Sequence, residues 1–548
     1  MKKNNLRQPL FYLGVIFILI LFIRLPSLAV PIYNVDEAAF AVIGNSIIDG
    51  QLIYRDIPDH AAPLTPYFYA LVFLLSGKNN MFAIHAALVL LIFGICVVLY
   101  RICALAGKKN AGYLAALFFG IFSYTYTASD VLAFETEWLS VLFSSLGAYF
   151  LLNYYFKNKP FSLFISGLFS ALAFFSKQLS LPVYAISLLF CCVFAYYNNK
   201  KTSAVFKAFL LNLSGFSAVF FLVIYYFYIN NASSDFRFWF WSYNNQYYVS
   251  AVPLTQRISS ALLYFIQRGS FFAVNYLLAI LFVTAVAITG WASFQSFARR
   301  KGLLIDWYLI AWAVFAYLGA AYSGRHFGHY YIIALGPFCL IAAATVQILL
   351  DASDSRGSKQ TAAGLNIPVI GILIIVVIFH GIFSPFYLHA GRLKEWKLPW
   401  QKDARRYYLP KPPYELSEYI KSNSGKQEKI FVWGFYPEIY VLAERMPAAR
   451  YINCNFLTGM IPWTNWQPGI DTSYTIVPGA WKIFMEEMER NKPKFIIDTS
   501  VGDINFYAKY PPEKFVLLYT FLQDNYKISK IFFKENGMPY VRLWERIN

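Results

Sequence analysis

Side chains that can carry or accept a proton are concentrated between residues 31 and 66, in PIYNVDEAAFAVIGNSIIDGQLIYRDIPDHAAPLTP. Only 14% of the chain is charged, so this density of acids directly after the first apolar run requires an explanation. A carboxylate at a helix start beside a membrane can act as a general base that takes the proton of a hydroxyl group. The residues are Asp36, Glu37, Asp49, Asp56, Asp59 and His60.

The segment Asn34-Val35-Asp36-Glu37 also has the pattern of a helix start. Asn34 is expected to cap a helix that begins at Val35, and Glu37, at the third helical position, is expected to close a capping box. This structural interpretation makes no use of Asp36. Asp36 is therefore free to point into a cavity, where we expect it to act as the base.

The composition predicts a polytopic membrane protein. The 548 residues are 58% hydrophobic and 20% aromatic, which is too apolar for a soluble protein of this size. The net charge of +18 comes largely from short basic clusters between apolar runs, as the positive-inside rule expects, so no nucleic-acid partner is predicted. Six cysteines without a CxxC motif indicate neither a disulfide framework nor a zinc site.

Eleven runs of about 20 mostly apolar residues predict membrane spans. With the N-terminus in the cytoplasm, the basic clusters between the runs also fall in the cytoplasm, and the odd number of spans puts the C-terminus outside. The predicted spans are 10–30, 81–105, 111–128, 137–156, 161–177, 179–197, 204–229, 270–294, 304–322, 329–350 and 364–386.

One further apolar run tests this count. Residues 63–77 are short and contain Pro63 and Pro66, and a span here would place the later basic clusters on the wrong side. We predict an interfacial or re-entrant helix instead, preceded by a second short helix over 38–48.

The predicted topology brings further polar residues to the outer face. Glu135 and Glu137 precede the fourth span, with an acid at a helix start as the structural alternative. Lys177 lies between two spans, where snorkelling to the interface explains it as well as phosphate binding does. Arg325, His326 and His329 precede the tenth span and suit an anionic phosphate, or simply anchor the span. Arg257 lies in an aromatic loop predicted over 230–269.

The composition changes after about residue 387, so we predict domains over 1–390 and 391–548, with an acidic external loop over 31–80. The second domain is expected to be α/β. Its predicted strands are 430–434, 449–454, 494–498 and a hairpin pair at 528–534 and 539–545, and its predicted helices are 437–445, 480–491 and 513–526.

The order of these motifs resembles the GT-C glycosyltransferases of the protein mannosyltransferase and lipid A aminoarabinose transferase type. The matching segments are the Asp36-Glu37 pair, YRDIPDHAAPLTPYFYA, ETEW before the fourth span, SKQ around Lys177 and GRHFGHYYIIALGP before the tenth. The resemblance covers about residues 1–390. It agrees with the predicted α-helical membrane domain of about 11 spans (GT-C fold) and the extracytoplasmic C-terminal domain, in the cell (plasma or inner) membrane.

The resemblance also implies the reaction. The donor would be a polyprenyl-phosphate sugar, and the acceptor an envelope lipid, glycan or protein. Asp36 would be the general base, and Glu37 would orient Asp36 or bind substrate. The donor phosphate would be bound by Lys177, Arg325, His329, His326 and Arg257. Glu137 (favoured by the family motif), Glu135, Asp59 and His60 would bind the acceptor or a divalent metal, whose requirement is left open. The alternative is a flippase or transporter of lipid-linked glycans, which charged residues inside the spans would favour.

Overall fold

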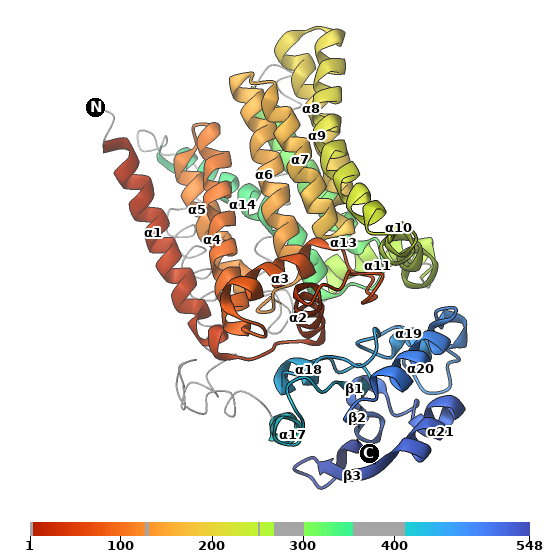
Figure 1. Ribbon diagram of the computed structural model, residues 1–548. Helices are drawn as coiled ribbons and strands as arrows, with labels where there is room; N and C mark the ends of the chain where they lie inside the picture. The colour runs from red at the N-terminus through yellow and green to blue at the C-terminus, as the bar shows by residue number, and fades with distance from the viewer. Residues whose placement is uncertain (1–3, 126–130, 250–251, 268–300, 355–410, 548) are drawn as a thin grey trace. The chain divides into compact units, whose positions relative to one another are not determined.

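The chain folds into two compact units in the computed structural model, which describes residues 4–125, 131–249, 252–267, 301–354 and 411–547 (Figure 1). The described residues of the helical unit come from Met1–Ser27, His85–Asn231 and Val252–Trp396. Those of the sheet-bearing unit come from Leu28–Ile84, Ala232–Ala251 and Lys397–Asn548. The acidic loop therefore belongs to the same unit as the C-terminal sheet. The predicted boundary at 390–391 lies outside the described residues.

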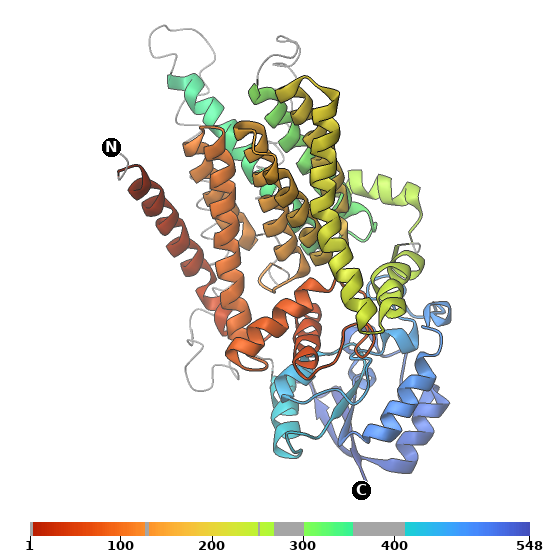
Figure 2. The same cartoon turned by 45° about the horizontal axis from the view of Figure 1, so that its top comes forward.

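The helical unit is formed by long, largely apolar helices. Their bounds are α1 Asn4–Arg24, α4 Met81–Leu105, α5 Lys109–Thr125, α6 Thr136–Lys157, α7 Phe161–Ser176, α8 Leu181–Asn199, α9 Thr202–Ile229, α11 Leu254–Gln267, α13 Lys301–Ala321 and α14 Ile332–Asp354. The helix α7 packs between α6 and α9, α8 packs on α9, and α14 packs against both α5 and α6 (Figures 1 and 2).

These helices confirm a multi-pass membrane protein. Six helical segments in the described ranges are long and apolar enough to cross a membrane: Met81–Leu105, Thr136–Lys157, Gln178–Asn199, Thr202–Ile229, Leu303–Ala321 and Gly328–Ile348. Gln8–Arg24 and Phe161–Ser176 are apolar but shorter. The predicted spans 270–294 and 364–386 lie outside the described residues, so the count of eleven stays a prediction.

The first predicted span, 10–30, was wrong at its end. The helix α1 stops at Arg24, and a 3-10 turn follows over Leu25–Ala29. Pro26 explains the change, because proline lacks the backbone N–H that would continue the helix and its ring restricts the preceding residue.

Two glycines allow α7 and α9 to pack with their backbones in close contact. A Cβ atom on Gly167 would lie 1.9 Å from the Asn212 carbonyl oxygen, and one on Gly215 would lie 1.9 Å from the Phe164 carbonyl oxygen. Small residues that permit such close approach are typical of helix pairs in membranes. α7 also packs directly against α6, with which it forms a hairpin.

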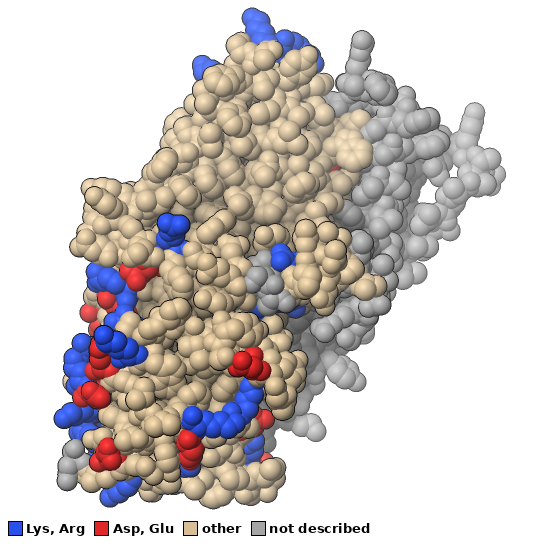
Figure 3. Space-filling view, turned by 90° about the vertical axis from the view of Figure 1, so that its right-hand side faces the viewer, with Lys and Arg blue, Asp and Glu red and all other residues tan. Residues whose placement is uncertain are grey.

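The outer surface of the helical unit is apolar. Only 17% of the most apolar window of α9 is buried, although its mean hydropathy is 2.0. Figure 3 shows a broad face without charged side chains over the helices, whereas Lys, Arg, Asp and Glu gather over the sheet-bearing unit. A large uncharged helical surface of this kind suits the hydrocarbon core of a bilayer.

The sheet-bearing unit combines a mixed sheet with short helices. Its strands are β1 Ile430–Trp433, β2 Phe495–Asp498, β3 Tyr526–Phe533 and β4 Pro539–Arg546, and its helices are α2 Val35–Ile48, α3 Leu64–Ser76, α10 Ser233–Phe236, a π-helix over Arg237–Val249, α17 Lys411–Ser422, α18 Glu438–Ala443, α19 Asn455–Thr458, α20 Ala480–Asn491 and α21 Val516–Asn525. The strand order is β1-β2-β4-β3.

The sheet is parallel in one half and antiparallel in the other. β1 pairs with β2 in parallel, and all residues of both strands are buried, as expected for strands covered on both faces. β4 pairs antiparallel with β2 and with β3, so the predicted terminal hairpin is confirmed. The predicted helices are also present, at the bounds of α18, α20 and α21.

The predicted strand at 449–454 was wrong. A single bridge joins Pro447 to Ile430 just before this segment, and Ala448 N–H donates to the Ile430 carbonyl at 2.8 Å. Arg450 N–H then bonds the Glu487 carboxylate instead of a strand partner. Pro447 has no backbone N–H to donate, and Glu487 accepts the N–H of Arg450. The hydrogen bonds that a β-strand needs are therefore not formed here.

The two segments predicted as loops, 31–80 and 230–269, both contain helices. The short helix predicted over 63–77 is α3, and the one predicted over 38–48 is α2, which begins three residues earlier. These two helices pack against each other. Within the predicted loop 230–269, Trp239 and Tyr243 are buried, and the Trp239 ring lies 4.6 Å from that of Phe456.

Candidate active site

The predicted cap at the start of α2 is confirmed. The Asn34 side chain accepts a hydrogen bond from Glu37 N–H at 2.9 Å. The Glu37 carboxylate is fully buried and accepts Tyr33 N–H at 2.9 Å, one residue before the position that a regular capping box uses. Glu37 therefore fixes the chain that enters α2.

Asp36 lies between these two residues, in the first turn of α2, and is partly exposed. A negative charge is stabilised there by the N-terminal end of the helix dipole. The cap thus places an ionisable carboxylate in a defined backbone position.

Asp59 and His60 lie in the same unit, and their side chains are close. Asp59 is buried and accepts Ala61 N–H at 2.6 Å, which tightens the turn before α3. His60 Nδ1 is 4.0 Å from the Asp59 carboxylate, and Asn244 donates to the His60 carbonyl at 2.8 Å. Both residues therefore help to hold this turn, and their acceptor or metal roles stay predictions.

Glu137 and Lys177 form a buried ion pair in the helical unit. Lys177 Nζ lies 2.8 Å from Glu137 Oε1, and the Glu137 side chain has no exposed surface. Thr136 Oγ1 donates to the other Glu137 oxygen at 2.9 Å. The pair forms because the hairpin of α6 and α7 brings the first turn of α6 beside the residue that ends α7.

Two residues from the 3-10 turn Gly328–Tyr331, which precedes α14, complete what we call the Lys177 cluster: Glu137, Lys177, His329 and Tyr330. Lys177 Nζ lies 4.2 Å from the centre of the Tyr330 ring, close enough for a cation–π contact. His329 is near enough to act electrostatically on Glu137. Residues predicted separately for donor and acceptor binding are thus brought together in one cluster.

The other predicted site residues of the helical unit are His326, Arg257, Arg325 and Glu135. Both ring nitrogens of His326 are in hydrogen bonds, one with Tyr331 and one with Ser260 at 2.7 Å. Arg257 Nε donates to the Val252 carbonyl at 2.6 Å. Arg325 is partly exposed, immediately before His326. Glu135 is buried at the N-cap position of α6.

A polar cavity of about 480 Å³ lies within the sheet-bearing unit. The buried side chain of Asn45 from α2 lines it, and its amide oxygen has no hydrogen-bond partner among the described residues. The lining otherwise is rich in charge: Asp49, Asp56, Lys78, Lys426, Lys429, Glu444, Arg445, Arg450, Glu487 and Arg490. Several of these charges are paired, as Arg450 is with Glu487 at 2.8 Å, so the cavity suits a polar ligand more than a strongly anionic one.

Across the described ranges, no three or more His, Cys, Asp and Glu side chains are grouped so that they could hold a metal ion. The candidate ligands Glu137 and Asp59 already have the contacts given above. Metal dependence stays a prediction.

Two charged residues were missed by sequence reasoning. Arg24 ends α1, is almost fully buried, and donates to the Ser123 and Val131 carbonyls at 2.7 and 3.2 Å. Its place at the end of an apolar run resembled an ordinary interfacial anchor. Glu438 begins α18, where an acid is common, and only the packing of α18 on α2 distinguishes it.

The comparisons with known proteins agree with this architecture. Residues 59–227 match the family model described as dolichyl-phosphate-mannose-protein mannosyltransferase. Comparison with curated protein sequences gives no match.

Two solved structures share the fold at low sequence identity. ArnT from Cupriavidus metallidurans, bound to undecaprenyl phosphate, is 11% identical, with a TM-score of 0.57 over 97% of this chain and 98% of that one. The oligosaccharyltransferase of Archaeoglobus fulgidus, tethered to an acceptor peptide, is 12% identical, with a TM-score of 0.53 over 97% of this chain and 73% of that one. The resemblance predicted from the motifs is confirmed: residues 59–227 match the protein mannosyltransferase family model, and the chain shares its fold with these two structures.

Proposed function

We propose that this protein is an inverting glycosyltransferase that moves a sugar from a polyprenyl-phosphate donor to an envelope acceptor, with Asp36 as the general base. The observation that supports it most is the capped first turn of α2, which holds Asp36 directly after the first apolar helix of a GT-C fold. The undecaprenyl phosphate bound by ArnT supports the choice of donor class.

In the proposed reaction, Asp36 takes the proton of the acceptor hydroxyl. The hydroxyl oxygen then bonds to the anomeric carbon as the bond from that carbon to the phosphate oxygen breaks. The electron pair leaves with the polyprenyl phosphate, an anion that needs hydrogen-bond donors rather than a general acid. A single displacement of this kind inverts the configuration at the anomeric carbon.

For the leaving phosphate we propose His329, Lys177 and Arg325, with Arg257 and His326 in supporting positions. Lys177 has three N–H donors, and its contact with Glu137 leaves donors for an anion. The two hydrogen bonds of His326 favour a role in holding the segment before α14. For the acceptor we propose the polar cavity beside Asn45, together with Asp59 and His60.

We propose that the N-terminus is cytoplasmic and the sheet-bearing unit extracytoplasmic, because the basic clusters then lie inside. Reporter fusions at residues 355 and 400 are expected to report opposite sides of the membrane, since the predicted span 364–386 separates them. Reporters that give the same side at both positions would disprove the eleven-span topology.

The function is tested with the purified protein in lipid nanodiscs, supplied with radiolabelled polyprenyl-phosphate sugars and an envelope extract as acceptor. We expect label to move from the lipid to the acceptor with inverted anomeric configuration, read by chromatography and NMR of the product. Boiled protein is the control. If no sugar in a panel of hexosyl and pentosyl donors is transferred, the proposal fails.

A further inference from the structure

A second carboxyl group lies beside the first turn of α2. The short helix α18 packs against α2, and Glu438 occupies the first turn of α18, as Asp36 does in α2. The two carboxyl groups are close enough for the charge of Asp36 to act on Glu438. The C-terminal domain thus brings one of its own acids to the candidate base.

Among the residues that the structure describes, no cationic side chain is paired with Glu438. Its Oε2 atom is buried and has no hydrogen-bond partner among the described residues. The other titratable side chains that interact electrostatically with Glu438 are Tyr436 and, from β4, Tyr540. Their hydroxyl groups are hydrogen-bonded to each other at 2.7 Å. Burial raises the pKa of Glu438 to about 8, and the negative charge of Asp36 adds to the rise.

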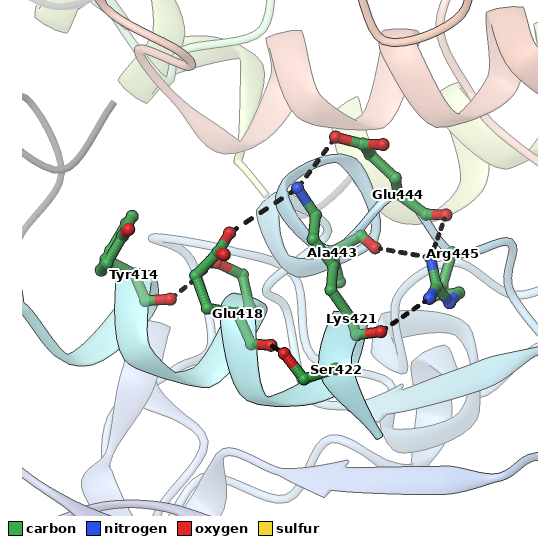
Figure 4. A network of polar contacts seen from close by, with 8 residues as sticks. Tyr414, Glu418, Lys421, Ser422, Ala443, Glu444 and Arg445 are labelled. Carbon is green, nitrogen blue, oxygen red and sulfur yellow. Dashed lines mark hydrogen bonds and ion pairs between the residues drawn. The ribbon is translucent and has the colours of Figure 1, made fainter. Parts of the chain in front are cut away.

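The position of α18 is fixed from its other end. Arg445 follows the helix and donates to the carbonyls of Ala443 at 3.2 Å and Lys421 at 3.2 Å, and Lys421 Nζ lies 2.8 Å from Glu444 (Figure 4). Lys421 also lies 3.8 Å from Glu418 on α17. These contacts hold the C-terminal end of α18 against α17. Glu438 lies at the opposite, N-terminal end of α18.

We propose that Glu438 is a positioning residue of the active site, a neutral carboxyl group that stands beside the ionised Asp36. A neutral acid can donate a hydrogen bond to a carboxylate or to the acceptor, which an ionised neighbour cannot do. It would keep Asp36 oriented toward the acceptor hydroxyl without adding a second negative charge. The role in transfer rests on the proposed function, whereas the coupling between the two carboxyl groups does not.

The sign of the pH dependence follows from the raised pKa. In the folded protein Glu438 keeps its proton up to a pH of about 8, whereas in the unfolded chain it ionises near 4.5. Between these pH values the folded state therefore binds more protons than the unfolded state. The contribution of Glu438 to the free energy of unfolding decreases as the pH rises through this window. Glutamine does not titrate and resembles the neutral acid, so Glu438→Gln removes this loss.

The test is thermal unfolding of the full-length protein in detergent from pH 5.5 to 8.5. Relative to wild type, Glu438→Gln is expected to raise the melting temperature by an amount that grows with pH and reaches about 2 °C or more at pH 8. In an Asp36→Asn background the gain should be clearly smaller, because the neighbouring charge is absent. Glu489→Gln, on the exposed face of α20, serves as the matched control and should show neither effect.

Two thermal results would overturn the pairing: a Glu438→Gln gain that does not grow with pH, or an equal gain with and without the Asp36 charge. The second arm measures transfer. Glu438→Gln should retain the rate at pH 7 within about threefold, whereas Glu438→Leu should lower kcat about tenfold with little change in KM, the cost of one hydrogen bond. Equal rates for the glutamine and leucine variants would refute the positioning role. If no protein transfers sugar, the proposed function fails while the thermal coupling still stands.

Discussion

Replacement of Asp36 with asparagine is expected to lower the transfer rate by about 100- to 10,000-fold, the usual contribution of a positioned general base. Asparagine has the size of aspartate but cannot accept the acceptor proton. The cap that Asn34 and Glu37 provide stays in place, so the fold should lose only about 0.3–1 kcal/mol of favourable charge at the helix start. The measurement is single-turnover transfer, with the melting temperature as the check on folding.

The matched control for this variant is Asp524→Asn. Asp524 is exposed near the end of α21 and does not line the polar cavity. It should transfer sugar at close to the wild-type rate. If the Asp36→Asn protein transfers sugar at the wild-type rate, Asp36 is not the general base.

The second large effect is expected at the buried ion pair. Lys177→Met should destabilise the protein by about 3–5 kcal/mol, because it leaves the Glu137 carboxylate uncompensated in a buried position. The double variant Lys177→Met with Glu137→Gln should recover most of that loss, since no unpaired charge remains. Unfolding in detergent, followed by denaturant titration, measures both.

The comparison pair for this experiment is Lys78 with Asp49, whose side chains are each about 40% exposed. Lys78→Met should cost no more than about 1 kcal/mol, as exposed ion pairs usually do. A cost at Lys177 as small as that at Lys78 would contradict the burial of the pair. If the double variant is stable but transfers no sugar, at least one member of the pair also acts in transfer; if it transfers normally, the pair is structural only.

The local features of the fold could be predicted from sequence, and the pairings between distant segments could not. The cap at Asn34 and the hairpin of β3 and β4 follow from residues that are neighbours in sequence, and both were predicted. The pairing of Lys177 with Glu137 depends on how two long helices end, which hydropathy does not reveal.

The errors have the same physical origin. The apolar pattern at 449–454 suited a strand, but strand formation depended on Pro447 and on a distant acid, Glu487. Glu438 was overlooked because an acid in the first turn of a helix is ordinary, and only its packing on α2 gives it meaning. Burial and neighbouring charges decide whether a carboxyl group is a solvated surface group or part of a site.

The glycine contact between α7 and α9 limits how the membrane region can move. With a backbone carbonyl of each helix seated over a glycine of the other, neither helix can rotate or slide without a collision. The two helices should therefore behave as one rigid body during turnover. Any opening that admits a long lipid tail would then have to come from other parts of the bundle, and hydrogen exchange during turnover should leave the middle of α7 and α9 protected.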